Sequence, residues 1–178
     1  WVNQYVPSTL QWEQRGVTIE QDGDFPQPSS TTFTVKTTQK QHFALNLLIP
    51  SWAEKASISI NGKKTSVKVT GKARYHTISR KWKDSDKVQL HLQGGFKIHH
   101  LQGDCQTIAI SYGPMLLAFI ENDKIELQLT EHQLLNNLQA TDASKGIFTL
   151  NHNGKQYTLR PLFDVDDETY SVYVQLKP

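Results

Sequence analysis

Seven histidines and one cysteine are the residues of this 178-residue chain that first suggest metal or nucleophilic chemistry. The densest group is His99, His100 and Cys105. Adjacent residues of a strand point to opposite faces, so at most one of the two histidines can share a site with a given neighbour. A structural zinc site needs four ligands, and no partner pair with ligand spacing is present. We therefore expect exposed strand histidines, with no metal site and no cofactor in this chain.

An acidic run near the end of the chain is the second candidate. It contains Asp164, Asp166, Asp167 and Glu168. Clustered carboxylates can hold calcium, but the glycine and regular spacing of a calcium loop are missing. Glycoside hydrolysis needs two carboxylates that face each other across a sugar, which neighbours in one loop rarely do. We expect a solvated turn, and an enzyme on a β scaffold that uses these residues stays as an alternative.

Other catalytic motifs are missing from the sequence. It contains no G-x-S-x-G elbow, and no glycine loop that would cradle a phosphate. Cys105 is not part of a recognisable motif that would supply a histidine as its base and a further group to orient that histidine. As the single cysteine, it also excludes an internal disulfide.

The tryptophans are candidates for binding a ligand rather than for catalysis. Trp12, Trp52 and Trp82 could stack on sugar rings, and two exposed, coplanar rings would indicate a carbohydrate-binding module. Trp52 follows a proline at the end of a strand, and Trp82 directly precedes a strand, where a ring usually covers the end of a core. We therefore favour packing for each of these rings. For Trp1, docking on another part of a longer protein is a further interpretation.

Charge and hydropathy exclude two classes of partner. The formal net charge is +2, whereas nucleic-acid contacts need a strong basic excess. No run of 18 or more apolar residues is present, so we expect no membrane span. Basic residues gather between positions 55 and 87. We assign them to the solvated face of a sheet, and an anionic partner is the alternative.

The elements that must position these residues are mostly strands. Phe43, Leu45, Leu47 and Ile49 alternate with other residues, as Val88, Leu90 and Leu92 do later, which predicts strands with one buried face. Asn-Gly pairs predict type I′ hairpins, since both central residues need positive φ. The all-apolar run Met115–Ile120 predicts a central strand that is covered on both faces. Further expected features are hairpins at Asn61-Gly62 and Asn153-Gly154, a final strand at Tyr170–Leu176 and a short helix at Thr130–Leu138 capped by Thr130 and Gln133.

These elements predict an all-β fold, a mainly antiparallel, jelly-roll-like β-sandwich with at most one short helix. The sandwich region spans residues 1–178. A break near Gln93 to Lys97 divides it into two lobes, 1–94 and 95–178. The chain begins without an initiator methionine, and we interpret it as a piece excised from a longer protein.

Several segments in order resemble a known family. They are VNQYVPSTLQW, FALNLLIPSWAEKASISINGK, YHTISRKWKDSDKVQLHL, ISYGPMLLAF and ETYSVYV. Together they resemble the C-terminal β-sandwich region of the DUF1680 family, glycoside hydrolases related to the β-L-arabinofuranosidases of GH127. The resemblance covers most of the chain and is weakest between residues 121 and 145.

The resemblance implies a role without catalysis. In that family an N-terminal (α/α)6 barrel holds the active site, with a zinc-bound cysteine nucleophile and glutamates. This chain resembles only the sandwich, and Cys105 lies in no matching motif. The resemblance thus implies an accessory domain that packs against the catalytic barrel of the same parent chain, which would act on plant-type polysaccharide with arabinofuranoside-like sugars. A periplasmic or secreted parent would suit such a substrate, and the sequence itself does not determine the compartment.

Overall fold

The structure is a computed structural model, and it describes residues 1–26 and 30–177. The chain divides into two compact units, Trp1–Gly94 and Gly95–Pro178, and each is described by itself. The division falls within a Gly-Gly pair. The loop predicted at 25–30 lies partly outside the described residues.

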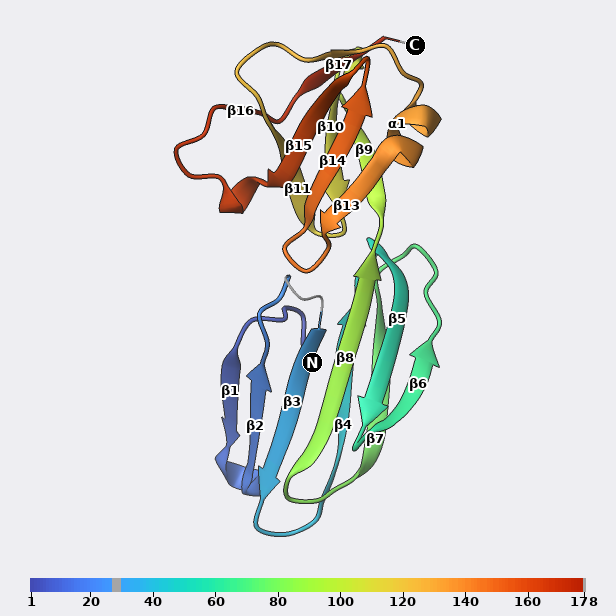
Figure 1. Ribbon diagram of the computed structural model, residues 1–178. Coiled ribbons are helices and arrows are strands. Elements are labelled where there is room, and N and C mark those ends of the chain that lie inside the picture. Colours follow the sequence, from blue (N-terminus) through green and yellow to red (C-terminus); the bar gives the residue numbers. More distant parts are fainter. Residues whose placement is uncertain (27–29, 178) are drawn as a thin grey trace. The chain divides into compact units, whose positions relative to one another are not determined.

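The first unit consists of two antiparallel sheets (Figure 1). Its elements are β1 (Ser8–Trp12), η1 (Glu13–Arg15), β2 (Val17–Asp22), β3 (Ser30–Thr37), β4 (Gln41–Ile49), β5 (Ala53–Ile60), β6 (Lys63–Val67), β7 (Arg74–Trp82) and β8 (Asp86–Gly94). Six strands form one sheet in the order β1-β2-β3-β8-β5-β6, and β4 pairs with β7 in the other. The second layer is therefore much narrower than the first.

The core of the first unit lies between these two layers. Along β4 the alternating residues Phe43, Leu45, Leu47 and Ile49 are buried, and they belong to the same cluster as the buried residues of β3 and β8. Trp82 at the end of β7 is fully buried in this cluster. Alternation thus places one face of each layer in a shared core, as predicted.

The tight turns of the first unit follow from residues that tolerate positive φ. Asn61 and Gly62 have φ values of 50° and 85°, which confirms the predicted hairpin. Ser85, with φ of 63°, forms the turn between β7 and β8, and its N–H donates to the Val35 carbonyl over 2.8 Å. In the same turn, Asp84 accepts a hydrogen bond from the Thr37 N–H. Asp84 and Ser85 therefore have a structural role in this turn.

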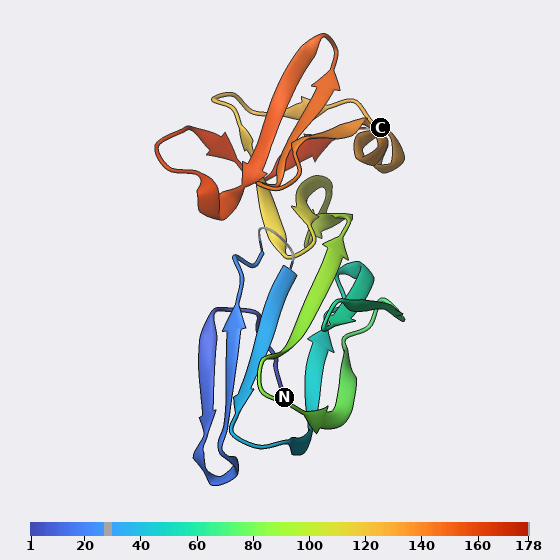
Figure 2. The ribbon, with the colours of Figure 1, turned by 60° about the horizontal axis from the view of Figure 1, so that its bottom comes forward.

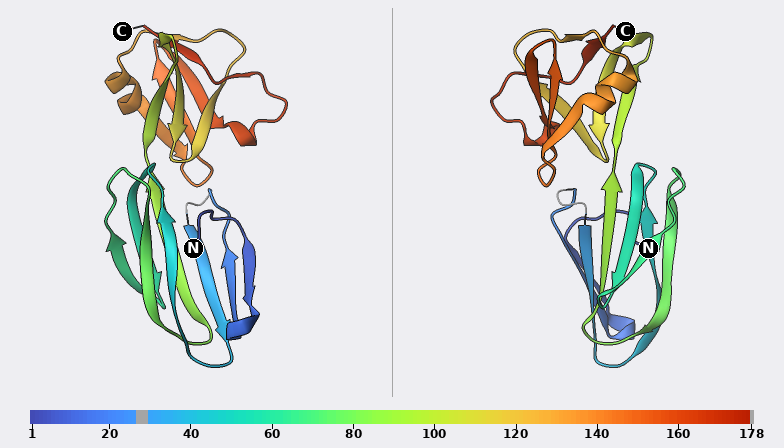
Figure 3. Two further views of the ribbon diagram at one scale, coloured as in Figure 1. Left: turned by 180° about the vertical axis from the view of Figure 1, so that it is seen from behind. Right: turned by 45° about the vertical axis from the view of Figure 1, so that its right-hand side comes forward.

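The second unit contains one larger sheet. Its elements are β9 (Phe96–Leu101), β10 (Asp104–Tyr112), β11 (Met115–Ile120), β12 (Glu126–Leu127), α1 (Glu131–Asn137), β13 (Leu138–Asp142), β14 (Ile147–His152), β15 (Lys155–Pro161), η2 (Leu162–Asp164), β16 (Tyr170–Ser171) and β17 (Val174–Leu176). The order is β12-β17-β10-β11-β15-β14-β13, with β9 also paired to β10 and β16 to β11. The sheet curls around its own core, and α1 lies beside β13 (Figure 3).

Two local predictions for the second unit are confirmed. Asn153 and Gly154 have φ values of 49° and 76° and join β14 to β15. The Thr130 side chain accepts a hydrogen bond from the Gln133 N–H, and the Gln133 side chain accepts one from the Thr130 N–H. This reciprocal capping box starts α1.

Two other predictions need correction. The single strand expected at Tyr170–Leu176 is two short strands, because β16 pairs with β11 whereas β17 pairs with β10 and β12. Strand β11 is central, but it is not covered on both faces along its whole length. Ala118 is fully buried, whereas Leu116 is 37% exposed.

The predicted fold class is confirmed: the chain is all-β and mainly antiparallel, with one short α-helix in the described residues. The clustered basic side chains between positions 55 and 87 are exposed or half-buried, as expected for a solvated surface. Within residues 1–26 and 30–177, no helix has the length and apolar character that a membrane crossing requires.

Candidate functional site

An open groove of about 610 Å³ on the first unit is the main candidate for a functional surface. It is lined by the segment before β1 and by residues of β1, β2, β3 and β4. Three large apolar side chains in its lining are strongly exposed: Trp1 at 79%, Val6 at 53% and Leu10 at 54%. Exposed apolar groups gathered at one place are typical of a surface that binds something.

The groove exists because the two layers of the first unit differ in width. Leu10 lies opposite Ile19, and Trp12 opposite Val17, so all four side chains share the inner face of the wide sheet. Ile19 and Val17 are buried, but Leu10 is exposed and Trp12 half-buried. The narrow β4–β7 layer therefore leaves the inner face of β1 uncovered. Figure 2 shows β1 as the outermost strand of the wide sheet.

Trp12 is held at one end of this groove. Its ring meets Phe43 edge-on at a centroid distance of 6.0 Å. The Arg15 guanidinium lies over the ring at 4.8 Å, a cation–π contact. Arg15 also donates to the His42 carbonyl over 3.2 Å, which ties η1 to the beginning of β4.

The segment before β1 is fixed to the other end of the β4 edge. The Val2 N–H donates to the Asn46 carbonyl over 2.8 Å, and the Leu48 N–H donates to the Val2 carbonyl over 3.1 Å. These bonds form an isolated parallel bridge between Val2 and Leu47. Trp1 meets Tyr75 edge-on at a centroid distance of 4.8 Å.

Tyr5 completes this attachment. Its side chain is buried, and its hydroxyl donates to the Leu48 carbonyl. Burial, together with the nearby Tyr75, raises the pKa of the Tyr5 phenol above its ordinary value. Tyr5 is therefore a neutral anchor and supplies no base.

The three tryptophans predicted as sugar-binding candidates do not come together. Trp82 is fully buried, stacks on Phe43 at 5.4 Å and donates from Nε1 to the Phe43 carbonyl over 3.0 Å, so it has no face for a ligand. Trp52 is half-buried, and its ring lies 6.0 Å from that of Phe25. Trp12 packs near the start of β4 and Trp52 follows its end, a separation along the strand of roughly 20 Å. The two rings thus offer no common platform.

The histidine and cysteine cluster of the second unit does not form a metal site. His99 Nε2 lies 2.8 Å from Ser111 Oγ, whereas His100 contacts the Cys105 carbonyl at 2.9 Å and Glu131 at 3.1 Å. Cys105 is exposed. Within the described part of the chain, no three His, Cys, Asp or Glu side chains are grouped as metal ligands.

The acidic run is held by an arginine that the sequence did not suggest. Arg160 donates to the Asp164 carbonyl over 2.5 Å and to its Oδ2 over 3.2 Å, and it also donates to Glu168. Asp164 and Glu168 both face the Arg160 guanidinium, so they do not face each other across a space for a sugar as a catalytic pair would. The backbone N–H groups of Glu168 and Asp166 are the main causes that lower the pKa of Glu168, and Arg160 contributes to the same shift. The four carboxylates of the run are exposed, as expected for a solvated turn, and two of them, Asp164 and Glu168, are also paired with Arg160.

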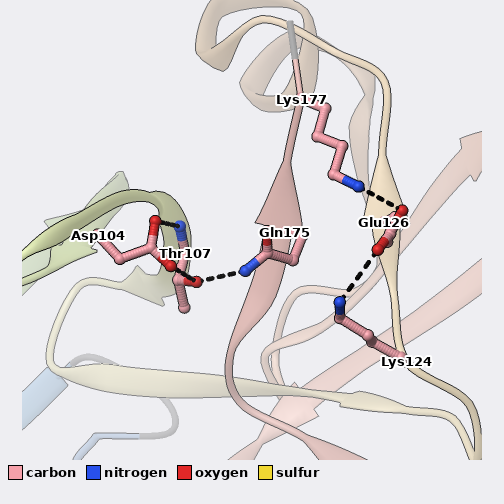
Figure 4. A network of polar contacts seen from close by, with 6 residues as sticks. All are labelled: Asp104, Thr107, Lys124, Glu126, Gln175 and Lys177. Atoms are coloured by element: carbon pink, nitrogen blue, oxygen red, sulfur yellow. Dashed lines mark hydrogen bonds and ion pairs between the residues drawn. The ribbon is translucent and has the colours of Figure 1, made fainter.

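A second polar network links β10 to the end of the chain (Figure 4). Thr107 Oγ1 donates to Asp104 Oδ2 over 2.5 Å and accepts from Gln175 Nε2 over 2.5 Å. The Thr107 hydroxyl and the Gln106 N–H lower the pKa of Asp104. Nearby, Glu126 accepts hydrogen bonds from Lys177 and Lys124, which lower its pKa, with Lys177 as the larger cause. Glu126 is paired with two lysines, and Asp104 accepts hydrogen bonds from neutral groups of its own strand, so the arrangement of both carboxylates is structural.

The sequence suggests Trp12 as a binding residue but gives no such indication for Leu10 and Val6, which line the same groove, or for Arg15, which lies over the Trp12 ring. The alternation of Leu10 and Trp12 in TLQW was an available signal for a shared face. Nothing in the sequence indicated that this face would lack a cover, because the width of the opposing layer is set by pairing of β4 with β7.

Comparison with known proteins agrees with this fold. Residues 1–94 match the model of the GH127 middle domain of β-L-arabinofuranosidases. A search of curated proteins finds no match. Similar solved structures include a glycoside hydrolase (17% identity, TM-score 0.67) that the chain matches over 96% of its own length. A GH127 β-L-arabinofuranosidase from Geobacillus stearothermophilus T6 (18% identity, TM-score 0.64) and a GH127 β-arabinofuranosidase (18% identity, TM-score 0.65) each match 99% of the present chain.

The chain spans only about a third of each of these structures, 34%, 33% and 36%. At this sequence identity, the structural likeness concerns the fold. The family match covers more than half of the residues of the chain. The chain therefore belongs to the GH127 β-L-arabinofuranosidase family, and its first 94 residues form the middle domain of that family.

Proposed function

We propose that this chain is a non-catalytic accessory part of a glycoside hydrolase and packs against the catalytic barrel of the same polypeptide. The observation that carries the proposal is the match of residues 1–94 to a middle domain, which by its description is one part of a β-L-arabinofuranosidase. The larger structural relatives, of which this chain spans about a third, are glycoside hydrolases by description. The parent would act on arabinofuranoside-like sugars of plant-type polysaccharide.

The side chains of the described residues support an accessory role. Two carboxylates of the acidic run, Asp164 and Glu168, both bind Arg160, whereas a glycosidase needs its carboxylates on either side of a sugar. The open groove is lined with exposed apolar side chains, and exposed apolar surface is typical of contact with another domain. The pairing of the two carboxylates with Arg160 and the apolar lining of the groove are therefore both compatible with the proposal.

Hydrolysis tests the catalytic half of the proposal. The purified chain is incubated with an aryl β-L-arabinofuranoside, and we expect no turnover, while the full-length protein releases the aryl alcohol. Turnover by the chain itself that disappears in an Asp164→Asn or Glu168→Gln variant would contradict the accessory role. Absence of turnover by the full-length protein would instead contradict the assignment of the parent as an arabinofuranosidase.

Packing against the barrel is tested separately, by charge placed on the groove. Leu10→Glu puts a carboxylate on the uncovered inner face of β1 and should weaken the association between this chain and the rest of the protein when the two are expressed separately. Gln11→Glu is the matched control, because Gln11 is exposed on the opposite face of the same strand. Equal binding of both variants in a titration would argue against the groove as the contact.

A carbohydrate-binding module remains the second candidate, and Trp12 supports it because its ring borders an open groove. Isothermal titration with arabino-oligosaccharides tests this candidate in the unmodified chain. Binding that is lost in Trp12→Ala and kept in Trp52→Ala would favour it. Trp82 is excluded from this role by its complete burial.

A further inference from the structure

The free edge of β4 forms one wall of the groove and is already used by one residue. Val2 donates to the Asn46 carbonyl and accepts from the Leu48 N–H, so Asn46 and Leu48 direct their backbone groups to this edge. Backbone groups alternate in direction along a strand, so Ala44 directs its N–H and C=O to the same edge. The opposite edge is paired with β7. Within the described residues, no strand lies beside Ala44 on the groove side.

The floor of the groove next to this edge is apolar. Leu10, Trp12 and Phe43 present their side chains there, and Leu10 is 54% exposed. A strand edge with unpaired backbone groups above an uncovered apolar face resembles a sheet that lacks one strand. The narrow β4–β7 layer would gain its third strand at this position.

We propose that the groove holds an extended strand of the same polypeptide, the segment that leads into Trp1, running parallel to β4. This inference rests on the proposed function, in which the chain is part of a longer protein. The parallel bridge between Val2 and Leu47 sets the register. In this register the residue immediately before Trp1 lies opposite Leu45, and the third residue before Trp1 lies opposite Phe43.

The register also predicts the chemistry of the strand. Residues opposite each other share a face of the sheet, so these two positions point to the groove floor with Leu45 and Phe43 and carry apolar side chains. The residue between them points outward and can be polar. Pairing ends at His42, whose carbonyl already accepts a hydrogen bond from Arg15. The inserted strand is therefore short, and its apolar side chains cover Leu10 and Trp12.

A strand fits this groove better than a sugar does. The Arg15 guanidinium covers one face of the Trp12 ring at 4.8 Å. The other wall is a row of backbone groups of Ala44 and Asn46, which match the regular repeat of a neighbouring strand. Continuity with the existing Val2 bridge supplies the third argument, because the same chain already begins the pairing.

Amide hydrogen exchange tests the inference. Exchange at Ala44 and Asn46 is measured by NMR or mass spectrometry in the full-length protein and in the chain that begins at Trp1. We expect both amides to exchange more slowly in the full-length protein, by about tenfold or more, since each gains a backbone acceptor. Equal exchange in the two forms would overturn the proposal. Slowing in the short chain on addition of an arabino-oligosaccharide would overturn it in favour of a sugar site.

A proline substitution adds a second readout. Ala44→Pro removes the N–H that faces the groove, which an edge strand tolerates and an internal strand does not. We expect a larger drop in melting temperature in the full-length protein than in the short chain, and equal drops would count against the strand. Both measurements are independent of hydrolysis, so loss of the arabinofuranosidase assignment and loss of the strand are distinguishable results.

Discussion

Asn61 donates a hydrogen bond from Nδ2 to Oδ1 of Asp86 over 2.7 Å and thereby joins two turns of the first unit. Its Oδ1 accepts from the Lys87 N–H over 2.8 Å. Asp86 is buried and accepts a further bond from the Lys83 N–H. The asparagine of the β5–β6 hairpin therefore has a second role, which is to satisfy a buried carboxylate at the start of β8.

The first prediction separates these two roles of Asn61. Asn61→Gly keeps the positive φ of the turn but removes both side-chain hydrogen bonds, and we expect it to lower the free energy of unfolding by about 1–3 kcal/mol. Asn153→Gly is the matched control, because Asn153 occupies the same turn position in the second unit, with φ of 49°. That variant should change stability by less than about 0.5 kcal/mol. Urea unfolding measures both, and equal losses would contradict the role of Asp86.

The second prediction concerns Trp82, whose ring is fully buried and whose Nε1 donates to the Phe43 carbonyl. Trp82→Phe leaves a small cavity and removes this donor, so we expect a loss of about 1–3 kcal/mol in unfolding free energy. Trp52→Phe should cost less than about 1 kcal/mol, because Trp52 is half-buried. Chemical unfolding followed by circular dichroism compares the two. A larger loss for Trp52→Phe than for Trp82→Phe would contradict the burial of Trp82 in the core.

The third prediction concerns the clamp of Arg160 on Asp164 and Glu168. Arg160→Gln removes the cation, so the segment between β15 and β16 should open more often and chymotrypsin should cleave faster after Phe163, which is 62% exposed. Arg160→Lys is the control that keeps the charge but cannot bind both carboxylates as a fork. We expect an intermediate cleavage rate. Identical rates in all three proteins would show that the clamp does not hold the segment.

The features predicted correctly from the sequence are local ones. Period-two alternation in Phe43–Ile49, the two Asn-Gly hairpins and the capping box of Thr130 and Gln133 each depend on a few neighbouring residues. Local backbone preferences and burial on one face determine them, so a short window is enough.

The features missed depend on partners that are far away in the sequence. The exposure of Leu10 follows from the two-strand width of the opposing layer, and the division of the last strand follows from separate pairing with β11 and β10. The acidic run is exposed, as expected, but no local signal indicated Arg160 as the partner of Asp164 and Glu168. Alternation identifies which segments are strands, but it does not determine which strands lie next to each other in the sheet.

The last prediction uses the pKa of Asp104 as a reporter of the network in Figure 4. The Thr107 hydroxyl, as the largest cause, and the Gln106 N–H hold this pKa below the ordinary value for aspartate. Thr107→Val keeps the shape but removes the hydroxyl, so the pKa of Asp104 should rise towards about 3.9, the value for an unstructured chain. Thr107→Ser keeps the hydroxyl and should leave the pKa low. NMR titration of the Asp104 carboxyl measures the difference.

The same shift has a consequence for stability. A carboxyl group whose pKa is lower in the folded than in the unfolded state stabilises the fold above the unfolded pKa, and this contribution is lost as the pH falls through the folded pKa. The original protein and Thr107→Ser should therefore lose stability in acid more steeply than Thr107→Val, in the range below about pH 4. Unfolding by urea at pH 7 and at pH 3 compares them. If Thr107→Val loses as much stability between these pH values as Thr107→Ser, the hydroxyl is not what holds the Asp104 charge.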